Sequence, residues 1–600
     1  MTTAEGVTWD LSVFYDGLED ARIDEDLAKA DELADQIVNS YKQKIPAASA
    51  QELFELFTKY EEYLEQIYRP WYYAQLRFNQ NNLDADVQTF LSRVEKRFTE
   101  ANNKLVFIDL EMNQIEDNRF AELLADDVLA EYRHYCELVR LKKPYQLTEE
   151  GEQVLKKKAL TSQKAWTKFY DEFTASLEFE IEIDGDDGEK KKKTLTGPEM
   201  RNLFTDPDRA LREQVFKTYY AAYEQHRLVL KNIFNSTFAD HTSTEELRGY
   251  EEPMVPAFIR DQFPPDERKV IKILMQVTRD NYSLLQDYFR LKAKILGHKM
   301  KGWDIVAPFP APEKIYDWET GKEMVLDAYQ AFSPEMRDAA QKFFENGWVD
   351  AEVRKGKSSG AACWPGTTRL PQYFWLSYEG KLNNVATLAH EMGHGIHGYL
   401  AGHSQNIFNK QCPKVLAETA SVFCEMLLTN KLMKELKDKE EKKKLLMDQL
   451  DDFHTTVFRQ VLYTLWELEA HEKGKEGAVS DEDLKKAWVK HTTEAYDDAV
   501  EFPPVMDWAF LAIPHFLWYL YYCYSYSFGY LFVVSLYNKY LKEGESFVPK
   551  YLDLLRAGGR DFPVKMAKSL DIDLTSEAFW QGGFDFFKRI LEELRSLVEE

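Results

Sequence analysis

Two histidines and a glutamate near residue 390 have the residue types and the spacing of a metal-dependent hydrolytic site. The segment NNVATLAHEMGHGIHGYL, residues 383–400, contains His390, Glu391 and His394 in the pattern H-E-x-x-H. Residues four apart project from the same face of a helix, so both imidazoles can bind a single Zn²⁺. Glu391 would then face the open position where a catalytic zinc holds a water, and we expect it to act as the general base. The apolar residues that flank the motif favour a buried helix over a chance match.

A third ligand is expected from a second apolar segment, residues 414–430, with the sequence KVLAETASVFCEMLLTN. It carries Glu418 and Glu425 seven residues apart, hence on one face of the predicted helix. A carboxylate on an apolar helix is rarely buried without a cation or a hydrogen-bond donor. We therefore expect Glu418 to bind the metal and Glu425 to accept a hydrogen bond from a group beside it. The alternative is that both charges face solvent.

Other residues give weaker support for a fourth metal ligand, a nucleotide site or a cysteine or serine nucleophile. His397 follows His394 by three residues and is expected to hydrogen-bond near the site, because a fourth protein ligand would close the catalytic position. The run Gly356-Lys357-Ser358 is similar to the end of a phosphate-binding loop, but the earlier glycine and a leading apolar strand are missing. The five cysteines are scattered without a C-x-x-C pair, and the sequence has no G-x-S-x-G motif.

The elements that must position these residues are predicted to be helices. Apolar residues recur at steps of three and four among charges at 24–44 and 50–68, and similar patterns fill 85–135, 208–233, 265–296, 431–473 and 581–598. Strict alternation at Ser176–Ile183, followed by DGDDG at 184–188, predicts a β-hairpin near 176–196. We expect an N-terminal helical region, residues 1–200, packed on a catalytic region, residues 201–600.

The composition excludes several classes of protein. A net charge of −26 without a basic, aromatic-rich stripe argues against nucleic-acid binding. The 44% share of hydrophobic residues is ordinary for a globular chain and too high for a disordered one. Few cysteines, and an N-terminus without a basic start or an apolar region, predict a cytoplasmic protein.

One long uncharged run raises the question of a membrane span. Residues 508–538 contain no Asp, Glu, Lys or Arg, and a run of this length could cross a bilayer. Pro514, His515 and seven tyrosines interrupt this run with a helix breaker and with polar groups that need partners in hydrocarbon. We expect a buried pair of helices and no membrane partner. A membrane-embedded zinc protease is the alternative.

Taken together, the motifs resemble oligoendopeptidase F, within the zinc peptidase family that includes thimet oligopeptidase. The similar stretches are AHEMGHGIHGYL, VLAETASVFCEMLL, IPHFLWYLYYCYSYSFGYL and AGGRDFPVKMAKSLDIDL, and the opening WDLSVFYDGLED extends the resemblance over essentially the whole chain. The resemblance implies a mainly α fold, in which a large helical ellipsoidal body with a small β element encloses a deep substrate channel. It also implies that this channel admits only unfolded peptides of limited length.

The resemblance implies roles for the residues of the motif. His390, His394 and Glu418 would bind one Zn²⁺ per chain, and Glu391 would be the general base. The family pattern also leads us to expect an arginine where Ser358 stands, so substrate specificity is expected to differ here if that arginine normally holds substrate.

Further along the chain, the resemblance points to donors for the oxyanion. His515 and one or more tyrosines between residues 519 and 530 would stabilise it by hydrogen bonds. Tyr522 is the preferred donor, Tyr526 is expected one helical turn away from it, and Tyr530 is a further candidate for substrate binding.

The predicted activity is zinc-dependent hydrolysis of internal bonds in short oligopeptides. Two alternatives stay open beside it, a zinc exopeptidase of the carboxypeptidase type and a non-catalytic peptide-binding protein that kept the helical shell. Oligopeptides are the expected partners, and the oligomeric state is left open.

Overall fold

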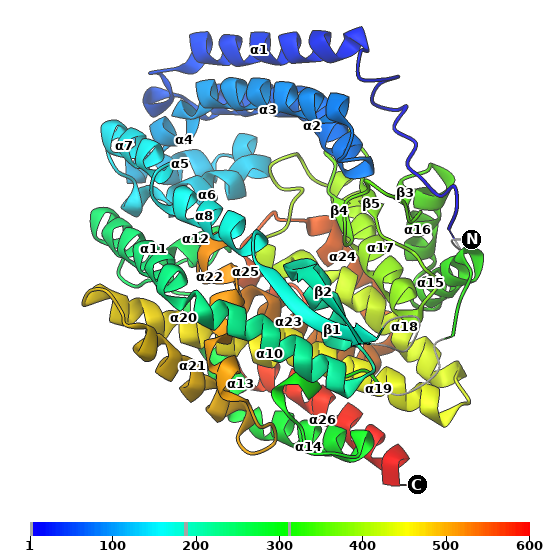
Figure 1. Cartoon of the computed structure of the whole chain (residues 1–600). Helices are drawn as coiled ribbons and strands as arrows, with labels where there is room; N and C mark the ends of the chain where they lie inside the picture. Colours follow the sequence, from blue (N-terminus) through cyan, green and yellow to red (C-terminus); the bar gives the residue numbers. More distant parts are fainter. Residues whose placement is uncertain (1–3, 185–189, 310–313, 600) are drawn as a thin grey trace. The chain divides into compact units, whose positions relative to one another are not determined.

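The computed structural model describes residues 4–184, 190–309 and 314–599, and most of its regular structure is helical (Figure 1). The chain forms two compact units: the first comprises Met1–Pro144, Glu313–Glu435 and Leu536–Asp573, and the second Tyr145–Pro312, Leu436–Ser535 and Leu574–Glu600. The prediction of a mainly α chain with a small β element is confirmed. The units interleave along the sequence, whereas the predicted domains, 1–200 and 201–600, are continuous; that division stays a prediction.

The first unit contains the predicted H-E-x-x-H helix. Its helices are α1 (Ala21–Tyr41), α2 (Ala50–Gln80), α3 (Ala85–Leu105), α4 (Phe107–Met112), α5 (Asp117–Ala125), α6 (Arg133–Leu141), α15 (Trp318–Phe332), α16 (Pro334–Glu345), α17 (Leu382–Gly402), α18 (Ser421–Glu435), α24 (Phe547–Ala557) and α25 (Pro563–Lys568). Helix α17 carries the motif and packs against α15, α16, α18 and α24. Its buried apolar side chains, among them Val385, Leu388 and Ile396, form the packing face that the sequence pattern predicts.

A short sheet lies beside α17 in the same unit. Its strands are β3 (Val349–Asp350), β4 (Ala362–Trp364) and β5 (Tyr373–Trp375), in the order β3-β5-β4. Strand β5 is parallel to β3 and antiparallel to β4, so β4 is an edge strand. The N-terminal segment fastens the sheet to the core of the unit, because the Trp9 indole Nε1 donates to the Phe374 carbonyl over 2.9 Å.

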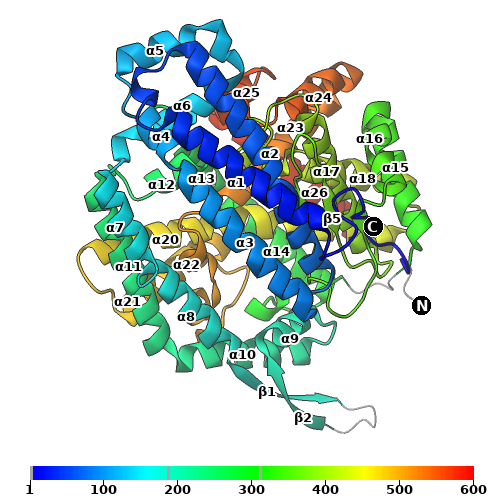
Figure 2. The same ribbon diagram turned by 90° about the horizontal axis from the view of Figure 1, so that it is seen from above.

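The second unit contains α7 (Glu149–Ala159), α8 (Gln163–Ala175), α9 (Gly197–Asn202), α10 (Arg209–Gln225), α11 (Arg227–Arg248), α12 (Val255–Arg260), α13 (Lys269–Asp280), α14 (Tyr282–Leu296), α19 (Lys439–Phe453), α20 (Arg459–Lys475), α21 (Asp481–Tyr496), α22 (His515–Trp518) and α26 (Glu577–Glu599). The predicted hairpin is present as the antiparallel strands β1 (Glu178–Asp184) and β2 (Lys190–Thr196), seen in Figure 2. Phe179 and Ile181 are buried and the intervening Glu180 is exposed, as the alternation requires. Most of the predicted turn, 185–188, lies outside the described residues.

The uncharged run 508–538 folds into several short pieces and one longer helix. A 3-10 helix covers Pro504–Ala512, α22 follows it, and α23 (Tyr524–Glu543) completes the run. Tyr521 and Tyr524 are fully buried, whereas Tyr519 is 63% exposed. Within the described residues, no helix is both long enough and apolar enough to cross a membrane.

Candidate active site

Three side chains of the first unit converge on one point. On α17 the Nε2 atoms of His390 and His394 lie 3.2 Å apart. The Oε2 atom of Glu418 lies 3.4 Å from each of these nitrogens. The two histidines and the glutamate therefore offer a nearly equilateral triangle of ligand atoms to a single cation.

The size of this triangle fits zinc. A tetrahedral Zn²⁺ with bonds of about 2.0–2.1 Å separates its ligand atoms by roughly 3.3 Å. The three observed separations, 3.2, 3.4 and 3.4 Å, agree with that value. Three protein groups would hold the zinc and would leave one position for water or substrate, as in catalytic zinc sites.

Glu418 reaches the histidines because the chain breaks its helix there. The predicted helix 414–430 is in fact a 3-10 helix, Lys414–Thr419, followed at Ser421 by α18. Gly393 of α17 allows the close approach, since a Cβ atom at this position would lie only 2.6–2.8 Å from backbone atoms of Ala420 and Ser421. The Ser421 hydroxyl donates to Glu418 Oε2 over 2.6 Å and orients the carboxylate.

Glu425, on α18, contacts His390 on the side of the ring opposite to Nε2. The Nδ1 atom of His390 forms a short hydrogen bond to the Glu425 carboxylate. Burial lowers the pKa of His390, but the hydrogen bond and charge of Glu425, with the charges of Glu418 and Glu391, raise it to about 10. Burial lowers the pKa of His394, which keeps that ring neutral and able to bind a cation. The carboxylates thus make the site strongly attractive to a positive charge.

Glu391 has the environment expected of a general base. Only 5% of the residue is exposed, and its Oε2 atom is buried without a hydrogen-bond partner among the described residues. Burial, together with the charges of Glu418 and Glu425, raises its pKa to about 7 despite the opposing effect of His390. A buried acceptor with no partner normally costs folding free energy, so it indicates a place kept for a proton donor such as water.

The converging groups line a pocket of about 470 Å³. Residues of the edge strand β4, Ala362 and Cys363, form part of its wall. His397 also lines the pocket, and it is buried and outside the triangle of ligand atoms. Burial, with the charges of His394 and Lys410, lowers its pKa to about 4, so its ring is neutral.

Lys410 is a pocket residue that the sequence reasoning missed. It is 4% exposed, and its Nζ donates to the carbonyl of Pro365, directly after β4. Burial lowers its pKa to about 8. A single lysine in the connection 403–413 has no spacing that would have pointed to this position.

Comparison with known proteins places the chain in a family. Residues 202–586 match the sequence model described as Peptidase family M3, and residues 111–179 match one described as Oligopeptidase F. The chain belongs to peptidase family M3. The resemblance seen in the sequence is thereby confirmed, and so is the prediction that the protein is an enzyme that hydrolyses peptides.

Relatives of this M3 peptidase cover almost its whole length. An oligoendopeptidase F homolog from Lactococcus lactis subsp. lactis is 26% identical over 99% of this chain and 98% of its own. Oligopeptidase PepF from Bacillus subtilis is 26% identical over 94% of this chain and 83% of its own. The same fold is seen in the crystal structure of oligoendopeptidase-F from Enterococcus faecium, with a TM-score of 0.72, 24% identity and coverage of 96% and 99%.

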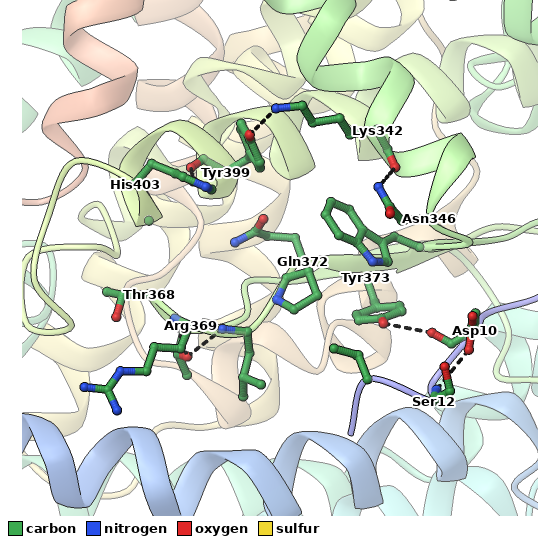
Figure 3. A pocket seen from close by; sticks show the side chains of 16 residues that line it. Asp10, Ser12, Lys342, Asn346, Thr368, Arg369, Gln372, Tyr373, Tyr399 and His403 are labelled. Atoms are coloured by element: carbon green, nitrogen blue, oxygen red, sulfur yellow. Dashed lines mark hydrogen bonds between the residues drawn. The ribbon is translucent and has the colours of Figure 1, made fainter. Parts of the chain in front are cut away.

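The M3 peptidase has a second hollow of equal volume in its first unit, about 470 Å³, at the C-terminal end of α17 (Figure 3). Lys342 points toward the ring hydroxyl of Tyr399 and donates to it, and the carbonyl of Tyr399 accepts a hydrogen bond from His403 Nδ1 over 2.8 Å. No member of the predicted metal site lines this hollow, so equal size does not make it an alternative catalytic pocket.

A second group of potential metal ligands is explained without a metal. His134, Glu137 and Asp561 bring ligand atoms within 4.8 Å of one another. The ammonium of Lys565 lies 3.3 Å from Asp561 and already supplies the positive charge there. This second group therefore needs no metal to balance its charge.

The predicted oxyanion donors belong to the second unit. The Tyr526 hydroxyl lies 3.4 Å from His515 Nε2, and the rings of Tyr522 and Tyr526 are 5.0 Å apart. Tyr522 precedes α23, so the prediction that it shares a helix with Tyr526 is wrong. The physical reason is a turn at Tyr521, whose φ of 53° is left-handed and ends regular helical geometry.

Tyr530 has a different setting in the same unit. It packs edge-on against Phe453, with ring centres 5.4 Å apart, within the helical core. The contribution of His515 and of these tyrosines to catalysis in the M3 peptidase stays a prediction.

Proposed function

We propose that this M3 peptidase is a zinc-dependent endopeptidase that hydrolyses internal bonds of short oligopeptides, with one Zn²⁺ per chain. The observation that carries the proposal is the triangle of His390, His394 and Glu418 beside Glu391, whose buried Oε2 atom has no hydrogen-bond partner among the described residues. The names of the relatives, which include oligoendopeptidase F, support an internal cleavage site.

The chain's own residues account for the proton transfers. A zinc ion held by the triangle would lower the pKa of a water and polarise the scissile carbonyl. Glu391 Oε2 takes the proton of the attacking water, holds it in the buried pocket, and passes it to the leaving amine. Burial raises the pKa of Glu391 above its ordinary value, which makes the carboxylate a stronger base toward the attacking water.

Positioning of the substrate follows from β4. Strand β4 pairs with β5 along one edge, and its residues Ala362 and Cys363 line the pocket. An extended peptide can add to such an edge by main-chain hydrogen bonds. His515, with Tyr522 or Tyr526, is proposed to donate to the oxyanion, where one donor is worth about 3–4 kcal/mol.

Product mapping tests the activity. Peptides of several lengths, blocked at both ends, are incubated with the zinc-loaded protein and the products are identified by mass spectrometry. We expect internal cleavage that stops when a chelator removes the metal and returns after one equivalent of Zn²⁺ per chain. Blocked peptides that stay intact, while unblocked peptides lose terminal residues, would show an exopeptidase instead. Turnover that persists in metal-free protein would exclude the metal site as the source of activity.

A further inference from the structure

A small aromatic cavity in the second unit is lined by an arginine that forms no hydrogen bond or ion pair with any residue the structure describes. Its volume is about 150 Å³, and eight aromatic rings or imidazoles contribute to its lining: Phe204, Phe216, Tyr220, His454, Tyr463, Trp488, Tyr496 and Phe502. Arg459 lines the same cavity from the first residue of α20. Its guanidinium lies over the ring of Tyr463, 6.0 Å from the ring centre.

Arg459 is half-buried, and its guanidinium is isolated from the hydrogen-bond acceptors that the structure describes. Within the described residues it forms no hydrogen bond or ion pair, and its Nε atom is buried without a partner. A buried donor without an acceptor costs folding free energy, and charged groups are rarely buried unless they are paired. An anion that enters the cavity would remove this cost.

The backbone directs Arg459 into the cavity. Residues His454–Phe458 form one turn of π-helix between α19 and α20. Such a turn inserts an extra residue into the helix and rotates the side chains that follow it, and single π-turns are frequent at functional sites. The first side chain after this turn is Arg459.

The other polar groups of the cavity carry no charge. His454 Nε2 is hydrogen-bonded to the Tyr496 hydroxyl over 2.7 Å. Burial and the charge of Arg459 lower the pKa of His454 well below its usual value, so the ring is neutral. Thr492 donates its hydroxyl to the Trp488 carbonyl. One unpaired positive charge among the lining residues matches an anion of one negative charge.

The size and the walls of the cavity define the rest of the ligand. A cavity of about 150 Å³ is large enough for one benzene-sized group. Aromatic walls favour an apolar or aromatic body, and a guanidinium binds a carboxylate through two parallel hydrogen bonds. We propose that this cavity is a binding site for a monocarboxylate with an apolar body the size of one ring, held by Arg459. Either a free small acid or the C-terminal residue of a peptide has this chemistry.

Calorimetric titration of the full-length, zinc-loaded protein tests the proposal without relying on catalysis. The probes are N-acetyl-L-phenylalanine for a free acid and Gly-Gly-Phe for a peptide end, each paired with its C-terminal amide. The peptide is checked by mass spectrometry to be intact after the titration. The variants are Arg459→Met, which removes the charge, and Arg459→Lys, which keeps it. Arg589→Met is the matched control, because Arg589 is exposed and also lies over a ring, 5.0 Å from that of Phe586.

We expect saturable binding of at least one free carboxylate, about ten- to a hundredfold weaker for its amide and for Arg459→Met, and unchanged in Arg589→Met. Which of the two acids binds identifies the source of the ligand. Equal binding of acid and amide, unchanged binding in Arg459→Met, or binding of neither acid would each overturn the proposal. If Arg459→Met does not fold, the ratio of acid to amide in the unmodified protein decides alone. A protein that binds these acids but cleaves no peptide contradicts only the proposed function.

Discussion

His390 and Glu425 are joined through the Nδ1 atom of the imidazole, and this contact leaves Nε2 for a metal. The ring is fixed in one orientation, with Nε2 3.4 Å from Glu418. A carboxylate behind a histidine ligand selects its tautomer and increases the basicity of the other nitrogen. The proposed metal site therefore depends on α18 as much as on α17.

Glu425→Gln should weaken zinc binding. The amide can still accept a hydrogen bond from His390 Nδ1, but the negative charge that stabilises a cation at Nε2 is lost. We expect zinc affinity to fall about ten- to a hundredfold, measured by competition with a chelator of known affinity. Glu435→Gln, at the other end of the same helix with a side chain 60% exposed, serves as the control and should keep the original affinity. Equal affinity in both variants would remove Glu425 from the metal site.

Glu391→Gln should separate metal binding from turnover. The residue is not a ligand, so zinc content should stay at one equivalent, while the missing proton acceptor lowers kcat by roughly a hundredfold to ten-thousandfold. Zinc analysis and cleavage of a fluorogenic peptide give the two readouts. Glu379→Gln, with an exposed side chain shortly before α17, should leave both unchanged. A Glu391→Gln protein with near-normal kcat would contradict the general-base role.

Gly393→Ala should disrupt the third ligand without touching any ligand side chain. The new methyl group would lie 2.6–2.8 Å from the backbone at Ala420 and Ser421, so the segment that carries Glu418 must move away. We expect zinc affinity to fall by about tenfold or more, together with a lower Tm. Gly582→Ala is the helical control, because a Cβ there meets no atom within 4 Å. Zinc binding that survives in Gly393→Ala would show that the two segments can separate at little cost.

Lys410→Met should affect substrate binding more than the metal. The variant loses the hydrogen bond to the Pro365 carbonyl that holds the end of β4, so a bound peptide is aligned less well. KM for oligopeptides should rise by about tenfold, the size expected for one charge-assisted hydrogen bond, while zinc content stays constant. Steady-state kinetics on blocked peptides, with Lys434→Met on exposed α18 surface as control, measure this. A fall in zinc content instead would assign Lys410 to the metal site.

Glu467→Gln should stabilise the protein at neutral and alkaline pH. Burial raises the pKa of Glu467 to about 8. Its Oε1 atom accepts from the Tyr521 amide over 2.8 Å, and its buried Oε2 atom has no partner in the part of the chain that the structure describes. Between pH 4.5 and 8 the unfolded chain therefore releases a proton that the folded chain retains, and stability falls as pH rises through this window. The variant should exceed the unmodified protein in unfolding free energy by a few kcal/mol at pH 8, and by about zero near pH 4.5.

Urea unfolding of the metal-free protein across this pH range measures the difference. Glu472→Gln lies on the same helix with a side chain 71% exposed and should show no such pH-dependent gain. A Glu467→Gln variant that loses stability at pH 8 would mean that the carboxylate is ionised in the folded chain and needed there.

The sequence predicted the local parts of the site well, because they depend on helical spacing. His390 and His394 project together from α17 as the four-residue step requires, and the apolar residues around them are buried. No glycine or proline marks the helix break before Ser421, so the sequence does not predict it. The break lies where the backbone packs closely against Gly393, which is a tertiary contact.

Contacts between distant segments were beyond the sequence patterns. Lys410 and Arg459 carry no motif, and their importance lies in what surrounds them: a carbonyl after a three-residue strand in one case, an unpaired charge among rings in the other. The spacing of Tyr522 from Tyr526 fits one helical turn and predicts a shared helix, but the left-handed residue Tyr521 interrupts the helix. Spacing predicts which face of a helix a residue would occupy. It does not predict the residue at which the helix begins.

The edge strand β4 is only three residues long, and this length limits what it can do. Main-chain hydrogen bonds to β4 do not distinguish one amino acid from another. Discrimination between peptides must therefore come mostly from side-chain pockets beyond the strand. The short length of β4 also limits pairing between two copies of the protein. Two copies would gain little by pairing these edges, so an open edge that can accept a foreign chain need not promote self-association.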